Sequence, residues 1–164
     1  VCALQKEGAL EAAAGLGVPV CLMHMQGNPG SMQKNPEYSD VVADVETFLL
    51  ERAGLAEAAG IPADHVLLDP GFGFGKTLQH NLDLLRQLPR LASHGDPVLA
   101  GLSRKSMLGP ITGREVDQRL AGSITLAVLS AQAGAAIIRV HDVAETRDAI
   151  EILSAISPKR LDSE

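Results

Sequence analysis

Short β-rich runs alternate with helical patterns along this sequence, and that alternation constrains the fold more than any other feature. The runs cover residues 18–23, 65–69, 97–101 and 136–140, and each is nearly continuous in apolar residues. Apolar residues at helical spacing predict helices at 8–14, 41–59, 81–91 and 117–133, and a last helix opens at 142–145 with Asp142 spaced as a capping box. Strict alternation predicts an α/β fold with a parallel sheet, whose strands are covered on both faces.

Two architectures fit this order of elements, a doubly wound open sheet and part of a (β/α)₈ barrel. The last three runs lead into reactive or ligand-type side chains, namely Asp69, then Ser103 and Lys105, then Arg139 and His141. Barrels gather active sites at the C-terminal ends of several strands, whereas an open sheet concentrates its site at one switch point. The pattern therefore favours a barrel. Only half of one is present, because whole barrels usually need about 250 residues.

The segment "LLDPGFGFGK" at 67–76 suggests a phosphate-binding loop but fails both nucleotide patterns. Pro70 stands where a P-loop needs its first glycine, and the third glycine of a dinucleotide fingerprint would fall on Lys76 or Leu78. What remains is a strand that ends in Asp69, followed by a backbone that can approach a ligand closely. The competing interpretation is a flexible loop with a solvated aspartate.

Composition excludes several classes of function. A net charge of −6, with three Phe, one Tyr and no Trp, argues against a nucleic-acid partner. No run has the length of a transmembrane helix and nothing resembles a signal peptide, so we expect no membrane partner and a cytoplasmic location. Cys2 and Cys21 lack metal or redox spacing and are predicted to be reduced core thiols. The chain opens with Val1, which indicates that it is cut from something longer.

The run "IIRVHD" places Arg139 and His141 two residues apart, so both side chains point to the same side of a strand. A guanidinium beside an imidazole is a plausible clamp for phosphate or an oxyanion. The competing interpretation pairs Arg139 with Asp142 or Glu145 and makes His141 a structural residue whose hydrogen bonds are satisfied within the protein.

The segment "GLSRKSMLG" at 101–109 supplies further donors after the third run, although alone it could be a basic surface turn. Met23 is a candidate apolar wall, and His24 is a candidate ligand, although a lone histidine is more often structural. No metal-ligand spacing and no serine nucleophile elbow is present. One carboxylate (Asp69), one ammonium (Lys105) and one anion clamp predict a ligand in which a donor-rich heterocycle is joined to a phosphate or diphosphate.

The sequence closely resembles the dihydropteroate synthase family of the bacterial folate pathway. The matching segments are "VCLMHMQGNP", "LLDPGFGFGK", "GLSRKSMLG", "RLAGS" and "IIRVHDV", which occur in order over nearly the whole chain. The resemblance implies a (β/α)₈ barrel that joins 6-hydroxymethyl-7,8-dihydropterin diphosphate to 4-aminobenzoate and releases pyrophosphate with Mg²⁺. It also implies that sulfonamides compete with the aminobenzoate.

The resemblance implies catalytic roles for Lys105, Arg139 and His141 and no metal ligand in this chain. It implies that Phe74, Ser103 and the stem of Lys105 shape the aminobenzoate site. The implied substrate-binding residues are Met23, Asp69, Gly73, Phe74, Gly101, Ser103, Lys105, Arg139 and His141.

Within that set, the resemblance assigns some residues to the pterin ring and others to the diphosphate. Asp69 is implied to bind the 2-amino and N3 edge of the pterin, and Lys105 to reach its O4 and N5 side. Met23 is implied to line the pterin pocket. Arg139 is implied to stack near the ring and touch phosphate, and His141 to bind the diphosphate.

The family's first half has no counterpart here, including the asparagine linked to Mg²⁺. We therefore expect residues 1–164 to form a single pterin-binding-type domain truncated at its N-terminus, with the Mg²⁺ ligand in the missing half. We expect the chain alone to be inactive, and the parent protein to form a homodimer through its C-terminal helices. Two rivals stay open: another pterin-binding barrel, such as a methyltetrahydrofolate methyltransferase, and a non-catalytic half-barrel.

Overall fold

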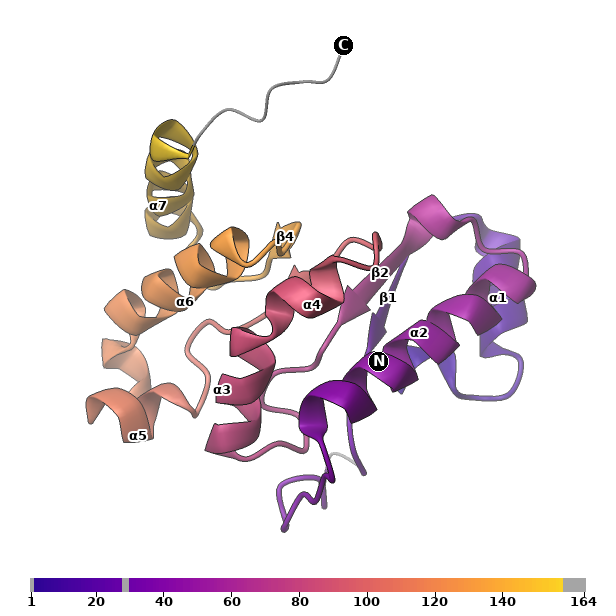
Figure 1. Ribbon diagram of the computed structural model, residues 1–164, viewed down its shortest axis with the longest axis horizontal. Helices are drawn as coiled ribbons and strands as arrows, with labels where there is room; N and C mark the ends of the chain where they lie inside the picture. The colour runs from indigo at the N-terminus through magenta and orange to yellow at the C-terminus, as the bar shows by residue number, and fades with distance from the viewer. Residues whose placement is uncertain (1, 28–29, 158–164) are drawn as a thin grey trace.

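The computed structural model describes residues 2–27 and 30–157 and contains the predicted alternation of strands and helices (Figure 1). The strands are β1 (Val20–Met23), β2 (Val66–Asp69), β3 (Leu99–Ala100) and β4 (Ile137–Ile138). The helices are α1 (Ala9–Leu16), α2 (Val41–Ala58), α3 (Leu78–Arg86), α4 (Leu88–Ala92), α5 (Leu108–Thr112), α6 (Leu120–Gln132) and α7 (Val143–Ile156). Short 3₁₀ turns cover Cys2–Leu4, Ala63–His65 and Val116–Gln118. Across the described ranges, no helix is both long enough and apolar enough to cross a membrane.

The described strands are parallel and follow one another in chain order. β1 pairs with β2 in a register that sets Met23 beside Asp69, and β3 pairs with β4 over both of its residues. A parallel bridge between Leu68 and Val98 joins the two pairs. The predicted parallel arrangement is therefore confirmed. The order shows no reversal among the described strands, so they lack the switch point at which a doubly wound sheet binds its ligand.

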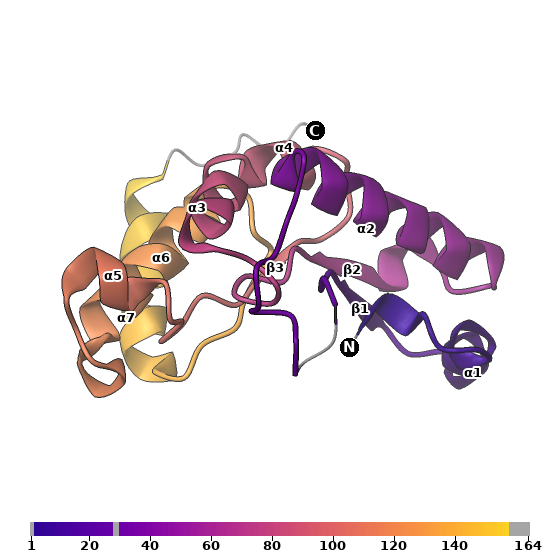
Figure 2. The same cartoon turned by 90° about the horizontal axis from the view of Figure 1, so that it is seen from below.

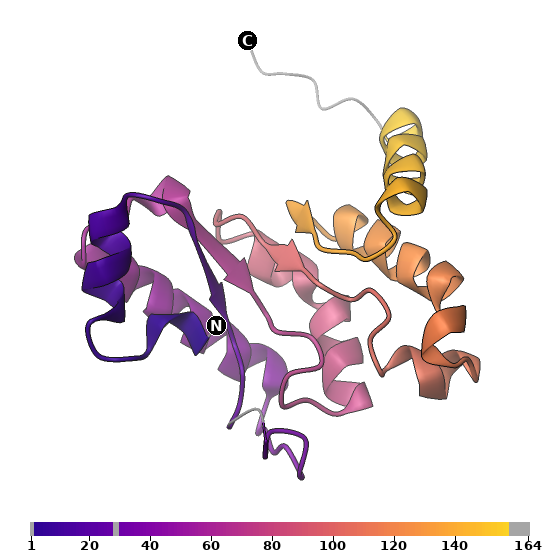
Figure 3. The same cartoon turned by 180° about the vertical axis from the view of Figure 1, so that it is seen from behind.

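One face of the strands is covered by helices and the other is open. Strand residues that face the helices are buried: Leu22, Val66, Leu68, Val98 and Ala100. Cys21, Leu67 and Leu99 alternate with them and are exposed or partly exposed. Figure 2 shows α2, α3 and α4 along one side of the strands, and Figure 3 shows the other side with no helix across it. The prediction that both faces are covered is wrong for the described part of the chain.

Helix caps fix where the chain leaves the loops that follow β1 and β2. The Asp40 carboxylate accepts hydrogen bonds from the backbone amides of Val42 and Ala43 and thereby starts α2. Thr77 and His80 form a capping box at the start of α3. These two caps hold the ends of the loops that carry the candidate site residues.

Two helix predictions need correction. The helix expected at 81–91 is divided into α3 and α4 at Gln87, because Pro89 in the first turn of α4 has no backbone N–H to continue α3. The capping box expected at Asp142 is absent, since its side chain makes no capping hydrogen bond. That carboxylate instead accepts hydrogen bonds from Arg104.

The prediction of core thiols is wrong for Cys21, which is exposed on the open face of β1. It alternates with the buried Leu22 and so points away from the helices. Partial desolvation beside the open face and the negative charge of Asp69 raise the pKa of the Cys21 thiol to about 11, so the thiol stays protonated at neutral pH. The side chain of Cys2 lies outside the described part of the structure.

Candidate functional site

Two adjoining hollows lie where the chain leaves β2, β3 and β4. The first has a volume of about 380 Å³ and is lined by Cys21, Met23, Asp69, Phe72, Phe74, Leu99, Gly101, Lys105 and Arg139. The second has a volume of about 540 Å³ and is lined by Gly101, Ser103, Arg104, Lys105, Ser106, Val116, Arg139, Val140 and His141. They share Gly101, Lys105 and Arg139. The nine residues predicted for substrate binding are thus brought to one region, since Gly73 lies against Lys105.

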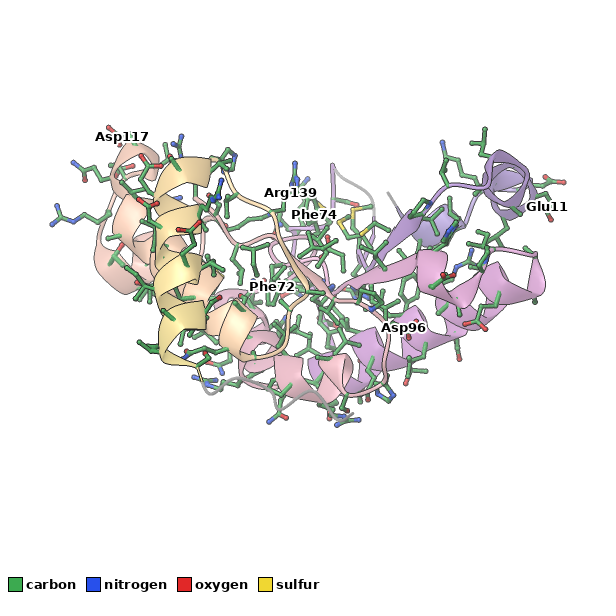
Figure 4. The ribbon with its side chains drawn as sticks, turned by 90° about the horizontal axis from the view of Figure 1, so that it is seen from above. Glu11, Phe72, Phe74, Asp96, Asp117 and Arg139 are labelled. Carbon is green, nitrogen blue, oxygen red and sulfur yellow. The ribbon has the colours of Figure 1, made fainter. Side chains whose placement is uncertain are left out.

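The open face of the strands carries this region. Figure 4 shows Arg139 and Phe74 projecting from the open side, whereas Phe72 lies between the strands and the helices. Phe72 is buried and belongs to the core. Phe74 is only partly buried and is available to a ligand.

Asp69 ends β2 and has one carboxylate oxygen committed to the backbone. Its Oδ1 accepts a hydrogen bond from the amide of Gly71 at 2.7 Å, and Oδ2 accepts none from the described residues. Burial raises the pKa of Asp69, while the Gly71 amide and the charges of Lys105, Lys76 and Arg139 oppose that rise. A partly desolvated carboxylate with a free oxygen is a strong acceptor for a ligand that presents N–H groups.

The glycine-rich loop after Asp69 is packed tightly against the segment that follows β1. Gly71 has φ +68°, and a Cβ there would lie 1.9 Å from the carbonyl oxygen of His24. Gly73 has φ +79°, and a Cβ there would lie 3.3 Å from Cδ of Lys105. At position 71 only glycine satisfies both the left-handed backbone and the close approach, and at position 73 the left-handed backbone favours glycine. The competing interpretation of a flexible loop with a solvated aspartate is therefore wrong.

Lys76 serves this loop and not the hollows. It is 4% exposed, and its Nζ lies 2.9 Å from Nδ1 of His24 and 3.1 Å from the carbonyl oxygens of Gly71 and Phe74. Burial lowers the pKa of Lys76 to about 7, with the Asp69 charge opposing. Burial and the nearby ammonium lower the pKa of His24 to about 3, so this imidazole is neutral. His24 is thus a buried structural residue and not a ligand facing the hollows.

Lys105 crosses from one hollow to the other over an aromatic ring. Its Nζ lies 4.2 Å from the centroid of the Phe74 ring, a cation–π distance, and donates no hydrogen bond to any group within the described ranges. Burial and the Arg139 charge lower the pKa of Lys105, and Asp69 opposes this. Its ammonium is therefore a donor held in place by the ring and free to meet a ligand.

Arg139 is free of ion pairs in the described part of the chain. The amide of Arg139 donates to the carbonyl of Ala100 at 3.0 Å, which continues the pairing of β4 with β3. The alternative ion pair between Arg139 and Asp142 is not formed, because Arg104 donates to both oxygens of the Asp142 carboxylate. The Arg139 guanidinium is left exposed to the hollows, where it can pair with an anion.

His141 is oriented by Ser103. The Ser103 hydroxyl lies 3.0 Å from Nδ1 of His141 and accepts from its backbone amide at 3.3 Å. Ser103 is 6% exposed, so its own reach into the hollow is small. The arrangement turns Nε2 of the imidazole away from Ser103 and makes it the nitrogen that can meet an anion.

Residues that the sequence analysis passed over hold this site in shape. Arg119 donates to the carbonyl oxygens of Arg104 and Lys105, and Ser123 accepts a hydrogen bond from the amide of Arg104. Arg104 needs this support because its φ is +55°. Arg119 and Ser123 belong to the "RLAGS" segment, and only the resemblance of this segment to the family could have indicated that these two residues support the site. Of the loop at 24–33, residues 28–29 lie outside the described part.

Comparison with known proteins identifies the class to which the fold and site belong. Residues 2–141 match the family model described as "Pterin binding enzyme", and the chain belongs to this family. It is 51% identical over 152 residues to the dihydropteroate synthase of Escherichia coli strain K12, a match that covers 93% of this chain and 54% of that protein.

Solved structures agree with this assignment. The dihydropteroate synthase of Stenotrophomonas maltophilia, with imidazole bound in its active site, has a TM-score of 0.92 at 52% identity and covers 95% of this chain and 59% of its own. That of Xanthomonas albilineans, in complex with 7,8-dihydropteroate, has a TM-score of 0.88 at 53% identity and covers 96% of this chain and 58% of its own. The chain thus spans a little more than half the length of the relatives it matches.

Proposed function

We propose that the full-length protein containing this chain is a dihydropteroate synthase of folate biosynthesis. It would condense 6-hydroxymethyl-7,8-dihydropterin diphosphate with 4-aminobenzoate to give 7,8-dihydropteroate and diphosphate. The observation that carries the proposal is the placement of Asp69, Lys105 and Arg139 around one hollow that opens onto a second hollow beside His141. A carboxylate, an ammonium and an anion clamp in this order fit a donor-rich ring that is joined to a diphosphate.

The first hollow is proposed to hold the pterin ring. The free oxygen of Asp69 would accept from the 2-amino and N3 groups of the ring, and Lys105 would donate to O4 or N5. Met23 would supply an adaptable apolar wall. Lys105 lies over Phe74 and pairs with no carboxylate of the described residues, so its donors stay available when the ring enters.

The second hollow is proposed to hold the diphosphate and to stabilise its departure. The amine nitrogen of 4-aminobenzoate attacks the methylene carbon, a C–N bond forms, and the C–O bond breaks with its electron pair leaving on diphosphate. The amine then releases a proton to solvent. Arg139 and His141 would bind the departing anion, and stabilising a developing charge in this way accelerates the reaction.

The aminobenzoate is proposed to lie beside Phe74, Ser103 and the stem of Lys105. The Xanthomonas albilineans relative has been solved with 4-aminobenzoic acid, and a Yersinia pestis relative with a sulfonamide drug complex. We infer that the full-length protein binds 4-aminobenzoate and is inhibited by sulfonamides at the same place.

Other features of the full-length protein are also proposals. We infer that this chain is one half of a (β/α)₈ barrel and is inactive by itself, because the open face of its strands would be the barrel interior. A homodimer through the C-terminal helices fits the exposure of Val143, Ile152 and Ile156 on α7. Cytoplasmic location and use of Mg²⁺ complete the proposal. Within the described residues no cluster of three or more metal-ligating side chains is found, and the Mg²⁺ ligand is proposed to lie in the other half of the barrel.

An assay of the full-length protein tests the proposed reaction. Pterin diphosphate and 4-aminobenzoate together should yield dihydropteroate and diphosphate in equal amounts, and omission of 4-aminobenzoate should abolish diphosphate release. Failure to form dihydropteroate would contradict the proposal. Transfer of a methyl group from methyltetrahydrofolate would support the rival pterin-binding barrel, which has no need for the anion clamp at Arg139 and His141.

A further inference from the structure

Lys76 forms a saturated hydrogen-bond junction beneath the glycine-rich loop. Its Nζ lies 2.9 Å from Nδ1 of His24 and 3.1 Å from the carbonyl oxygens of Gly71 and Phe74. In its protonated form Lys76 has one N–H donor for each of these three partners. The nitrogen is buried and lines neither hollow. The mechanism proposed above makes no use of this lysine.

The junction decides which way the loop presents its polar groups. Lys76 holds the carbonyls of Gly71 and Phe74, and the Gly71 carbonyl also accepts from the amide of Phe74 at 3.0 Å. At the start of this same turn the Gly71 amide donates to Oδ1 of Asp69 at 2.7 Å. The Phe74 side chain, on the same loop, then meets Lys105. Both groups proposed to contact the pterin ring are therefore set by backbone that Lys76 holds.

His24 ties the same junction to β1. Its backbone amide donates to the carbonyl of Asp69 at 2.9 Å, and its neutral imidazole lies against Lys76 and, edge-on, against the ring of Phe48 at 5.0 Å. A lysine at this place thus links the ends of two strands to the loop between Asp69 and Phe74.

We propose that Lys76, held by His24, is a positioning residue that sets Asp69, and through Phe74 the ammonium of Lys105, for recognition of the pterin ring. This inference rests on the function proposed above. Lys76 lines neither hollow, and its removal should affect binding of the ring and spare binding of the diphosphate, because Arg139 and His141 are held by β3 and Ser103.

The test compares ligand binding to the full-length parent protein and to Lys76→Met, which keeps the side-chain length and removes the donors. Affinity for bare 6-hydroxymethylpterin should fall about tenfold or more, the effect of leaving the Phe74 carbonyl without its side-chain donor and the Gly71 carbonyl with the Phe74 amide alone. Affinity for inorganic diphosphate should change by less than about twofold. Arg90→Met is the matched control, since it breaks an ion pair with the buried Glu46 that lines neither substrate hollow.

A second pair of variants keeps the inference testable if Lys76→Met does not fold. His24→Asn retains an acceptor near Nδ1 and should bind pterin nearly as the parent does, whereas His24→Leu should weaken pterin binding selectively. Equal binding by the two His24 variants, an unchanged pterin affinity in Lys76→Met, or an equal loss for pterin and diphosphate would each overturn the inference. Absence of pterin binding to the parent would overturn the proposed function itself, and the inference with it.

Discussion

Replacement of Asp69 by asparagine in the full-length protein should weaken pterin binding without weakening the fold. One carboxylate oxygen already accepts from the Gly71 amide at 2.7 Å, and an asparagine would turn its carbonyl oxygen to that amide. Its NH₂ group would then face the hollow, where the proposed ring presents N–H groups. An acceptor for the ring is thereby exchanged for a donor.

The size of the effect follows from the number of bonds lost. Loss of one hydrogen bond to a charged acceptor typically costs about 1.5–3 kcal/mol, which is roughly a ten- to hundred-and-fiftyfold weaker affinity. Calorimetry with bare pterin and with pterin diphosphate should show this loss for both ligands. Asp83→Asn, which alters an exposed ion pair with Arg86 on α3, is the control and should leave both affinities unchanged.

Stability measurements separate this effect from unfolding. Burial raises the pKa of Asp69, so the ionised carboxylate is less favourable in the folded protein than in the unfolded chain. The parent should lose this part of its stability as pH rises from the unfolded-state pKa through the raised folded-state pKa. Asp69→Asn should remove that loss and be at least as stable as the parent at pH 7. Parent-like affinity of Asp69→Asn for bare pterin would refute the assignment of this carboxylate to the ring.

Three further predictions concern the anion clamp, the helix layer and the isolated chain. Arg139→Ala in the full-length protein should lower the rate of dihydropteroate formation about a hundred- to thousandfold, while bare pterin binds nearly as before. An equal loss of the reaction rate and of the affinity for bare pterin would count against a role of Arg139 in binding diphosphate. Burial raises the pKa of Glu46, but hydrogen bonds from Arg90 and His94 outweigh burial and lower it. The ionised Glu46 should therefore stabilise the fold above the ordinary carboxyl pKa, and this stability should be lost as pH falls through the lowered pKa. Urea unfolding of Glu46→Gln should show less loss of stability in acid than the parent, and a pH profile equal to that of the parent would refute the prediction. The isolated chain should self-associate through its uncovered strand face and outer strands, and a compact monomer at high concentration in sedimentation would contradict this.

The pattern of the sequence was sufficient for the parallel order of the strands and for the clustering of Asp69, Lys105 and Arg139. Alternating β and α elements allow few topologies, and side chains that follow parallel strands must emerge at the same end of the sheet. The open face of β1 was missed, because apolar continuity does not reveal whether a second layer is present. Cys21 illustrates this, since its neighbours in sequence are those of a core residue.

The sequence pattern could not predict which distant residues the polar side chains would contact. Asp142 has the spacing of a helix cap, yet Arg104 lies 38 residues away and takes its carboxylate. Lys76 follows a glycine-rich loop as a phosphate-binding lysine would, yet it turns inward to His24 and the loop carbonyls. In each case a tertiary contact outweighs the local signal, and that contact depends on which segments the fold brings together.

A crystal structure of the full-length protein with 6-hydroxymethylpterin diphosphate tests the central claim most directly. We expect the ring to lie in the hollow between Met23 and Lys105, with its N–H edge about 3 Å from the free oxygen of Asp69, and the diphosphate to contact Arg139 and His141. A ring bound elsewhere, or bound in this hollow with its N–H edge turned away from Asp69, would contradict that claim.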